Sequence, residues 1–224
     1  LNKTGLKDAV RAILWSQGEA DSFSGGLSTS AYKIAFNSIR NSWRADYQSI
    51  EQIFIFQTRD CDCGTISSGR KKIKEAQRQL AEDYSNIYIM GTSGISVHSD
   101  NCHFPFSNGY ELFGQRIFKP LMKSIYNFNY NSEIDPPLIL SVNLTQTQTL
   151  VIETSSNNLI AGSNNYFQLL GKIQDDFVLT TANGGSVDSF QIQGGNLILG
   201  LNGDPGTSAK ISFIGKHSGT NNNI

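Results

Sequence analysis

Along roughly the first 130 residues, short apolar runs alternate with longer stretches in which apolar residues recur every three or four positions. The runs at 9–16, 52–57 and 86–90 lack helical spacing and predict three β-strands. The spacing within 32–47 and 73–84 places the apolar residues on one face of a helix. The sequence therefore predicts the order strand–helix–strand–helix–strand.

A third helix is predicted after the loop that follows the last of these strands. Ser107 is expected to cap it, because a serine side chain accepts backbone N–H groups of the first turn. Apolar residues within 110–121 supply its buried face. Strands joined by helical crossovers lie parallel in one sheet with helices on its faces. We therefore predict a three-layer α/β/α fold.

The pattern changes after Asp135-Pro136-Pro137, because a helix cannot continue through this pair of prolines. The remaining apolar runs are short, and clusters of Asn, Gly and Ser separate them. They are LILSVNL, TLVIET, YFQLLG, FVLTTA, SFQIQ, NLILGL and AKISFIG. Such runs predict an antiparallel β-sandwich. We expect an α/β domain over 1–132 and a β-sandwich accessory domain over 133–224.

The charge balance argues against two classes of function. The 224 residues include 18 Lys and Arg against 19 Asp and Glu, a net charge of −1 without long blocks of one sign. A nucleic-acid-binding arm or a membrane-surface helix needs a concentrated positive field, which this sequence lacks. No apolar run approaches the ~20 residues that a membrane-spanning helix needs.

Composition also bears on where the protein works. Only 17% of the residues are charged, and polarity comes instead from Asn, Ser, Thr, Gln and 21 Gly, as is typical of exported proteins. We expect a secreted or periplasmic protein. The chain opens with Leu1, without an initiator Met or a signal peptide. We therefore expect it to be an internal piece of a longer protein.

Two polar clusters follow predicted strands, at the edge where parallel α/β sheets bind ligands. In the cluster at 98–104, Asp100 stands three residues before His103. Such a carboxylate can fold back in a tight turn and hold one imidazole nitrogen, leaving the other as a general base for a serine. The alternative is a surface loop with unrelated polar residues.

The other cluster is Trp15-Ser16-Gln17-Gly18-Glu19, after the first predicted strand. The Gln17 amide can donate to a developing oxyanion. Gly18 gives the segment flexibility, and Glu19 can orient that amide or a neighbouring backbone group. Alternatively, Gln17 and Glu19 only cap the next element.

The two clusters, in this order and at these strand ends, resemble the sialate O-acetylesterase and carbohydrate acetylesterase branch of the SGNH hydrolases. That branch carries Trp-x-Gln-Gly-Glu in mid-domain and Asp-x-x-His before its final helix, which correspond here to 15–19 and 100–103. The stretch 31–47 is also similar to the family's intervening helix. The resemblance covers about residues 5–125 and not the β-rich half.

The resemblance implies a flavodoxin-like α/β/α domain that deacetylates a sialate or another acetylated sugar by Ser-His-Asp acyl transfer. It implies His103 as the general base, Asp100 as the residue that orients it and Gln17 as an oxyanion donor. Gly18 and Glu19 would support that donor. The chemistry needs no metal and no organic cofactor.

One part of the family pattern is missing. The nucleophilic serine of these enzymes lies in a Gly-Gln-Ser-Asn-type block after their first strand, and this chain has no such block. Ser93 is the nearest imitation, but it lacks the elbow spacing and follows the wrong strand. We expect the serine and the first strands of the domain to lie upstream of Leu1. This chain alone is then a poor esterase or inactive.

Two other functions stay open. A non-catalytic cell-surface or glycan-binding protein could keep an esterase scaffold, and the absence of a Gly-x-Ser-type block upstream would favour it. A zinc-stabilised module would use Cys61-x-Cys63 with His98 and His103, although structural zinc sites usually show wider cysteine spacing. The third histidine, His217, is expected at the surface, and the oligomeric state is left open.

The three cysteines predict one disulfide. Cys61 and Cys63 follow the second predicted strand, and Cys102 stands beside His103. Cysteines one residue apart bridge poorly, so we expect Cys102 to pair with Cys61 or Cys63, with three free thiols as the alternative. Mass mapping of non-reduced peptides from the exported protein should find Cys102 in a linked peptide; three alkylatable thiols would contradict the bridge.

Overall fold

The computed structural model describes residues 5–23, 26–58, 68–92, 95, 98–100, 103–131, 133–135, 137–146, 148–159 and 177–213. The chain divides into two compact units, Leu1–Ile134 and Asp135–Ile224, and each has its own hydrophobic core. The division falls where the two prolines begin, close to the boundary expected from the sequence.

A parallel sheet forms the centre of the first unit. Its strands lie in the order β1 (Ala12–Ser16), β2 (Gln52–Phe56), β3 (Ile87–Met90), and each falls within a run predicted as a strand. The register places Ser16 opposite Phe56, and Phe56 opposite Met90. The three strands therefore end side by side, and the polar segments after β1 and β3 leave the sheet at the same edge.

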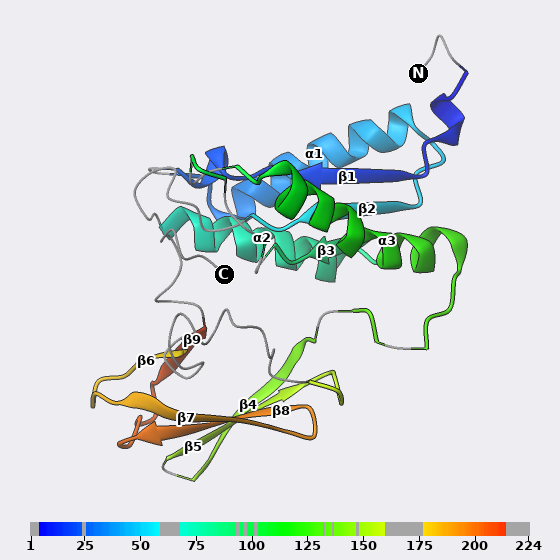
Figure 1. Ribbon diagram of the computed structural model, residues 1–224. Coiled ribbons are helices and arrows are strands. Elements are labelled where there is room, and N and C mark those ends of the chain that lie inside the picture. Colours follow the sequence, from blue (N-terminus) through cyan, green and yellow to red (C-terminus); the bar gives the residue numbers. More distant parts are fainter. Residues whose placement is uncertain are drawn as a thin grey trace. The chain divides into compact units, whose positions relative to one another are not determined.

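Helices cover both faces of this sheet (Figure 1). On one face, α1 (Thr29–Asp46) and α2 (Ser68–Asp83) share a buried cluster with Ile53 and Ile55 of β2. On the other face, α3 (Glu111–Tyr126) packs against Phe54 and Phe56. The central strand is thus buried on both sides. The predicted α/β fold with a parallel sheet between helices is confirmed.

The helix termini follow local sequence only in part. Ser28 caps α1, because its Oγ accepts the Ala31 N–H at 3.1 Å. The prediction that Ser107 caps the last helix was wrong: Ser107 lies inside a wide π-turn, Phe106–Tyr110, that precedes α3. The rings of Phe104, Tyr110 and Phe113 contact one another, and this aromatic packing accompanies the wider turn.

The first unit has an open sheet edge in its described part. There β1 pairs with β2 alone. Leu14 of β1 is in register with Phe54 and points to the α3 side, but 54% of its surface is exposed. An unpaired edge beside an exposed leucine can accept a further strand. That the first strands of the domain lie upstream of this chain stays a prediction.

The second unit is built from antiparallel sheets (Figure 1). Four strands pair in the order β4 (Ile139–Gln146), β5 (Thr149–Thr154), β8 (Asn196–Asn202), β7 (Ser186–Gln193), and β6 (Phe177–Thr180) pairs with β9 (Lys210–Phe213). Phe177 of β6 shares a core with Ile152 and Leu199 of the larger sheet. Six of the seven predicted runs lie in these strands; YFQLLG and His217 lie outside the described residues.

None of the helices in the described part of the chain is long and apolar enough to cross a lipid bilayer.

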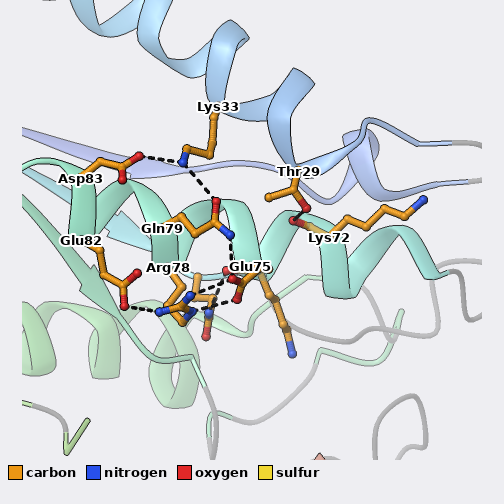
Figure 2. Close-up of polar contacts among 10 residues, drawn as sticks. Thr29, Lys33, Lys72, Glu75, Arg78, Gln79, Glu82 and Asp83 are labelled. Carbon is orange, nitrogen blue, oxygen red and sulfur yellow. Dashed lines mark hydrogen bonds and ion pairs between the residues drawn. The ribbon is translucent and has the colours of Figure 1, made fainter. Parts of the chain in front are cut away.

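Polar contacts join α1 to α2 and run along α2 (Figure 2). Lys33 of α1 donates to Gln79 Oε1 at 3.1 Å and pairs with Asp83 at 2.7 Å. Gln79 in turn donates to Glu75, which also accepts two hydrogen bonds from Arg78, at 2.7 and 2.8 Å. Hydrogen bonds from Arg78, and secondarily from Gln79, lower the pKa of Glu75 from 4.5 to about 2 against the opposing effect of burial.

Glu75 should therefore stabilise the protein in a pH-dependent way. Because its pKa is lower in the folded state, its charge stabilises the fold above the unfolded value of 4.5, and this stability is lost as the pH falls towards 2. The pair is partly exposed, so we expect Glu75→Gln to cost less than ~1 kcal/mol near neutral pH. Calorimetric melting at several pH values should show the difference from the wild type shrinking in acid; a constant difference would contradict this role.

Candidate active site

Asp100 and His103 form a closed turn after β3. Asp100 Oδ1 accepts the backbone N–H of His103 at 2.9 Å, and Asp100 Oδ2 lies 2.7 Å from His103 Nδ1. Each carboxylate oxygen thus has its own contact with the histidine. A second backbone hydrogen bond, from His98 N to His103 O at 2.9 Å, holds the loop closed. The imidazole is therefore fixed both through its own backbone and through its ring.

This contact also determines which ring nitrogen of His103 is available. A carboxylate accepts, so the contact favours the tautomer of the neutral imidazole in which Nδ1 carries the proton and Nε2 has the lone pair. The side chain is 71% exposed, which leaves Nε2 open to a substrate or a nucleophile. Chemically, a histidine held in this way by a carboxylate can act as a general base.

His98 approaches the same carboxylate. Its Nδ1 lies 3.3 Å from Asp100 Oδ2, the oxygen that also holds His103. The sequence hypothesis placed these histidines together only as zinc ligands. Among the residues that the structure describes, no three His, Cys, Asp or Glu side chains are arranged to hold a metal. Cys61, Cys63 and Cys102 lie outside the described residues, as does Ser93.

The Gln17 side chain is oriented by a residue that the sequence analysis did not single out. Gln17 Nε2 donates to Asp21 Oδ2 at 2.6 Å. An amide has two N–H groups; one is held by Asp21, and within the described part of the chain no acceptor binds the other. Glu19 contributes its backbone: its carbonyl accepts from the buried Ser22 hydroxyl at 2.6 Å and from the Ser22 N–H at 3.1 Å.

Gly18 packs too closely for any larger residue. A Cβ atom built on it would lie 2.6 Å from Thr58 Cγ2 and 2.9 Å from Ile73 Cγ2. Its φ of +138° is also a conformation that side-chain-bearing residues rarely adopt. The glycine of the first cluster is therefore required for close approach of the backbone to α2 and to the end of β2, and not only for flexibility.

Two further residues that the sequence analysis missed hold the backbone of this segment. The Gln17 carbonyl accepts from Gln77 Nε2 at 3.0 Å and from the Tyr32 hydroxyl at 3.2 Å. In the sequence, Tyr32 is part of the apolar face of a helix, and Gln77 is one polar residue among many on the next helix. The contact of Asp21 with Gln17 could have been predicted from the sequence, since the two residues are only four positions apart.

The family of this chain follows from a sequence comparison. The model of the family described as "SASA: Carbohydrate esterase, sialic acid-specific acetylesterase" matches residues 2–123, which is more than half of the chain and includes both polar clusters. The chain belongs to this family. The resemblance derived from the two motifs is thereby confirmed, and the SASA family is one of ester-bond hydrolases.

A solved structure shows the same fold. The chain is similar to XAC1771, a novel carbohydrate acetylesterase from Xanthomonas citri, with a TM-score of 0.63 and 16% sequence identity. The match covers 87% of this chain and 43% of XAC1771. This SASA-family chain therefore spans less than half the length of that protein. No curated protein matches it.

Gly18 and Gly91 offer a matched pair of substitutions at the same sheet edge. Gly18→Ala should strain the backbone by ~1–3 kcal/mol in addition to its clash with Thr58 and Ile73. A Cβ on Gly91, directly after β3, would meet nothing within 4 Å, so Gly91→Ala should leave the melting temperature close to that of the wild type. Thermal melts of both variants test this; equal melting temperatures would show that the Gly18 segment is not tightly packed.

Proposed function

We propose that the protein containing this chain is a carbohydrate O-acetylesterase that works by Ser-His-Asp acyl transfer. The observation that carries the proposal is the 2.7 Å contact between Asp100 Oδ2 and an exposed His103, whose remaining nitrogen is free to act as a base. The SASA family description and the name of XAC1771 support acetylated sugars as the substrate class. A sialate is one such sugar.

The reaction would begin when a serine upstream of Leu1 attacks the acetyl carbonyl carbon. His103 Nε2 takes the serine proton, and Asp100 stabilises the imidazolium that forms. Collapse of the tetrahedral intermediate transfers this proton to the departing sugar oxygen and leaves an acetyl-enzyme. Water, activated in turn by His103, then releases acetate and restores the serine.

The Gln17 segment would stabilise the oxyanion of both tetrahedral intermediates. The Gln17 N–H that does not bind Asp21 is the proposed donor. Asp21 holds the amide in place before the reaction, so that little reorganisation is needed when charge develops. Gly18 and Glu19 support the donor through the backbone. Every step uses side-chain and backbone groups, so the proposal calls for no metal and no organic cofactor.

We further propose that the protein is secreted or periplasmic. The low share of charged residues supports this location. The polarity of the chain comes instead from Asn, Ser, Thr, Gln and Gly, as is typical of exported proteins. The predicted bridge from Cys102 would form in such a compartment.

The decisive experiment uses the full-length protein, expressed with its natural upstream segment. Acetate release from an aryl acetate is followed with and without a serine-directed phosphonate. We expect release that the phosphonate abolishes, with the label on an upstream serine. A folded protein that neither releases acetate nor takes the label would instead favour a glycan-binding protein on an esterase scaffold.

Variants of the same protein test the individual roles. His103→Ala should lower kcat/KM by about 10²–10⁴-fold or more, the usual contribution of a general base. Gln17→Ala should lower it by about 10²–10³-fold, as expected for one oxyanion donor. His98→Ala is the matched control within the same loop and should cost far less, since its ring is further from Asp100 than that of His103. Near wild-type turnover of His103→Ala would refute the base assignment.

A further inference from the structure

A single buried amide joins the carboxyl ends of β1 and β2 to α2. Gln77 of α2 is 0% exposed, and its side chain spans the backbones of two loops. Nε2 donates to the Gln17 carbonyl at 3.0 Å, and Oε1 accepts the Thr58 N–H at 2.9 Å. Gln17 directly follows β1, and Thr58 is the second residue after β2. Gln77 thus links the backbones at the two strand ends and holds them at a fixed distance on the α2 side of the sheet.

The orientation of this amide is fixed by its partners. Oε1 faces an N–H group, which can only donate, and Nε2 faces a carbonyl, which can only accept. The second Nε2 hydrogen goes to the Tyr32 hydroxyl at 3.3 Å. A rotation of the amide by 180° would place like groups against each other. The buried polar atoms are therefore satisfied in one arrangement only.

Tyr32 adds a second donor to the same carbonyl. Its hydroxyl donates to Gln17 O at 3.2 Å and accepts from Gln77 Nε2 and from Trp15 Nε1. Burial raises the pKa of Tyr32, more than its hydrogen bonds from Trp15 and Gln77 lower it. The phenol therefore stays protonated and remains a donor. Two donors from two helices hold one carbonyl oxygen.

Holding this carbonyl determines where the next N–H points. The described peptide bonds are trans, and in a trans peptide the N–H is directed opposite to the C=O. The Gln17 carbonyl points towards α1 and α2, so the Gly18 N–H points away from them. No described residue accepts a hydrogen bond from that N–H. This N–H and the Gln17 side-chain amide are thus two donors on neighbouring residues, each with an N–H that no described acceptor binds.

We propose that Gln77 is a positioning residue, which orients the Gln17–Gly18 peptide so that the Gly18 N–H acts as an oxyanion donor beside the Gln17 side chain. The proposal rests on the esterase function proposed above. Backbone N–H groups are effective donors in such sites because they are preorganised. A misplacement of about 1 Å can cost 10²-fold in rate, so loss of the Gln77 contacts should reduce turnover although Gln77 touches no substrate.

If Gln77 had a purely structural role, its loss would lower the stability of the protein without a specific effect on turnover. Any loss of a buried hydrogen-bonded group lowers stability, so a lower melting temperature alone does not separate the two roles. Leu80 lies on the same helix, is equally buried and packs in the core of α1 and α2, and its apolar side chain makes no hydrogen bond to the Gln17 segment. Leu80→Ala therefore lowers stability without touching the strand-end hydrogen bonds, and serves as the matched control.

The test compares Gln77→Met and Leu80→Ala in the full-length protein with an aryl acetate as substrate. At a temperature where both variants are folded, we expect Gln77→Met to lower kcat by about 10²-fold with little change in KM, and Leu80→Ala to stay within about twofold of the wild type. Equal kcat values for the two variants would overturn the positioning role and leave the esterase proposal intact. If Gln77→Met does not fold, Tyr32→Phe removes the second donor to the same carbonyl and should lower kcat by a smaller factor; an unchanged kcat would again overturn the role.

An NMR measurement separates this inference from the proposed function. The amide resonance of Gly18 should shift in Gln77→Met and stay in place in Leu80→Ala, whether or not the protein hydrolyses esters. An unshifted Gly18 resonance in Gln77→Met overturns the positioning role. If the wild type shows no hydrolysis while the Gly18 resonance does shift, the esterase proposal and the donor role of Gly18 fail, and the positioning of the peptide by Gln77 is upheld.

Discussion

Parallel pairing of β1, β2 and β3, with the last residues of the three strands in register, is the constraint on which the candidate site depends. It sends the Gln17 segment and the loop of Asp100 and His103 out of the same edge of one sheet. The central strand cannot slip, because Phe54 and Ile55 are fully buried on its opposite faces. A shift by one residue would exchange those faces. The pairing that forms the core therefore also fixes where the two polar clusters begin.

The two clusters are held in physically different ways. Asp100 orients His103 through a turn of three residues, so this pair depends on local geometry and tolerates exposure to solvent. The Gln17–Gly18 peptide is held by Gln77 and Tyr32, which come from two helices and are buried. A buried amide with all its partners satisfied gives rigidity that an exposed loop contact cannot give. The proposed base is thus positioned by local contacts, and the proposed oxyanion donors are positioned by the packing of two helices.

The chain belongs to the SASA family and covers 43% of the length of XAC1771. In the proposed mechanism it supplies the base, the carboxylate that orients the base and the oxyanion segment, and the reaction needs a serine from elsewhere in the protein. The open edge of β1, with the exposed Leu14 beside it, is the place in the described structure where a further strand can pair. A proposed upstream strand that bears the nucleophile would lie next to Gln17 there, which is the neighbourhood that the oxyanion donors require.

Local spacing in the sequence determined the strands, the helical faces, the α/β class and the pairing of Asp100 with His103, because each depends on residues close together in the chain. The Asp-x-x-His turn needs only three residues to bring its groups into contact. Short-range reasoning failed at Ser107, where contacts among Phe104, Tyr110 and Phe113 accompany a wide turn in place of a serine cap. Only the tertiary structure revealed Gln77, since 60 residues separate it from Gln17. Nothing in a helix pattern distinguishes a polar residue that faces solvent from one that faces the end of a neighbouring strand; the packing of α2 on the sheet decides between them.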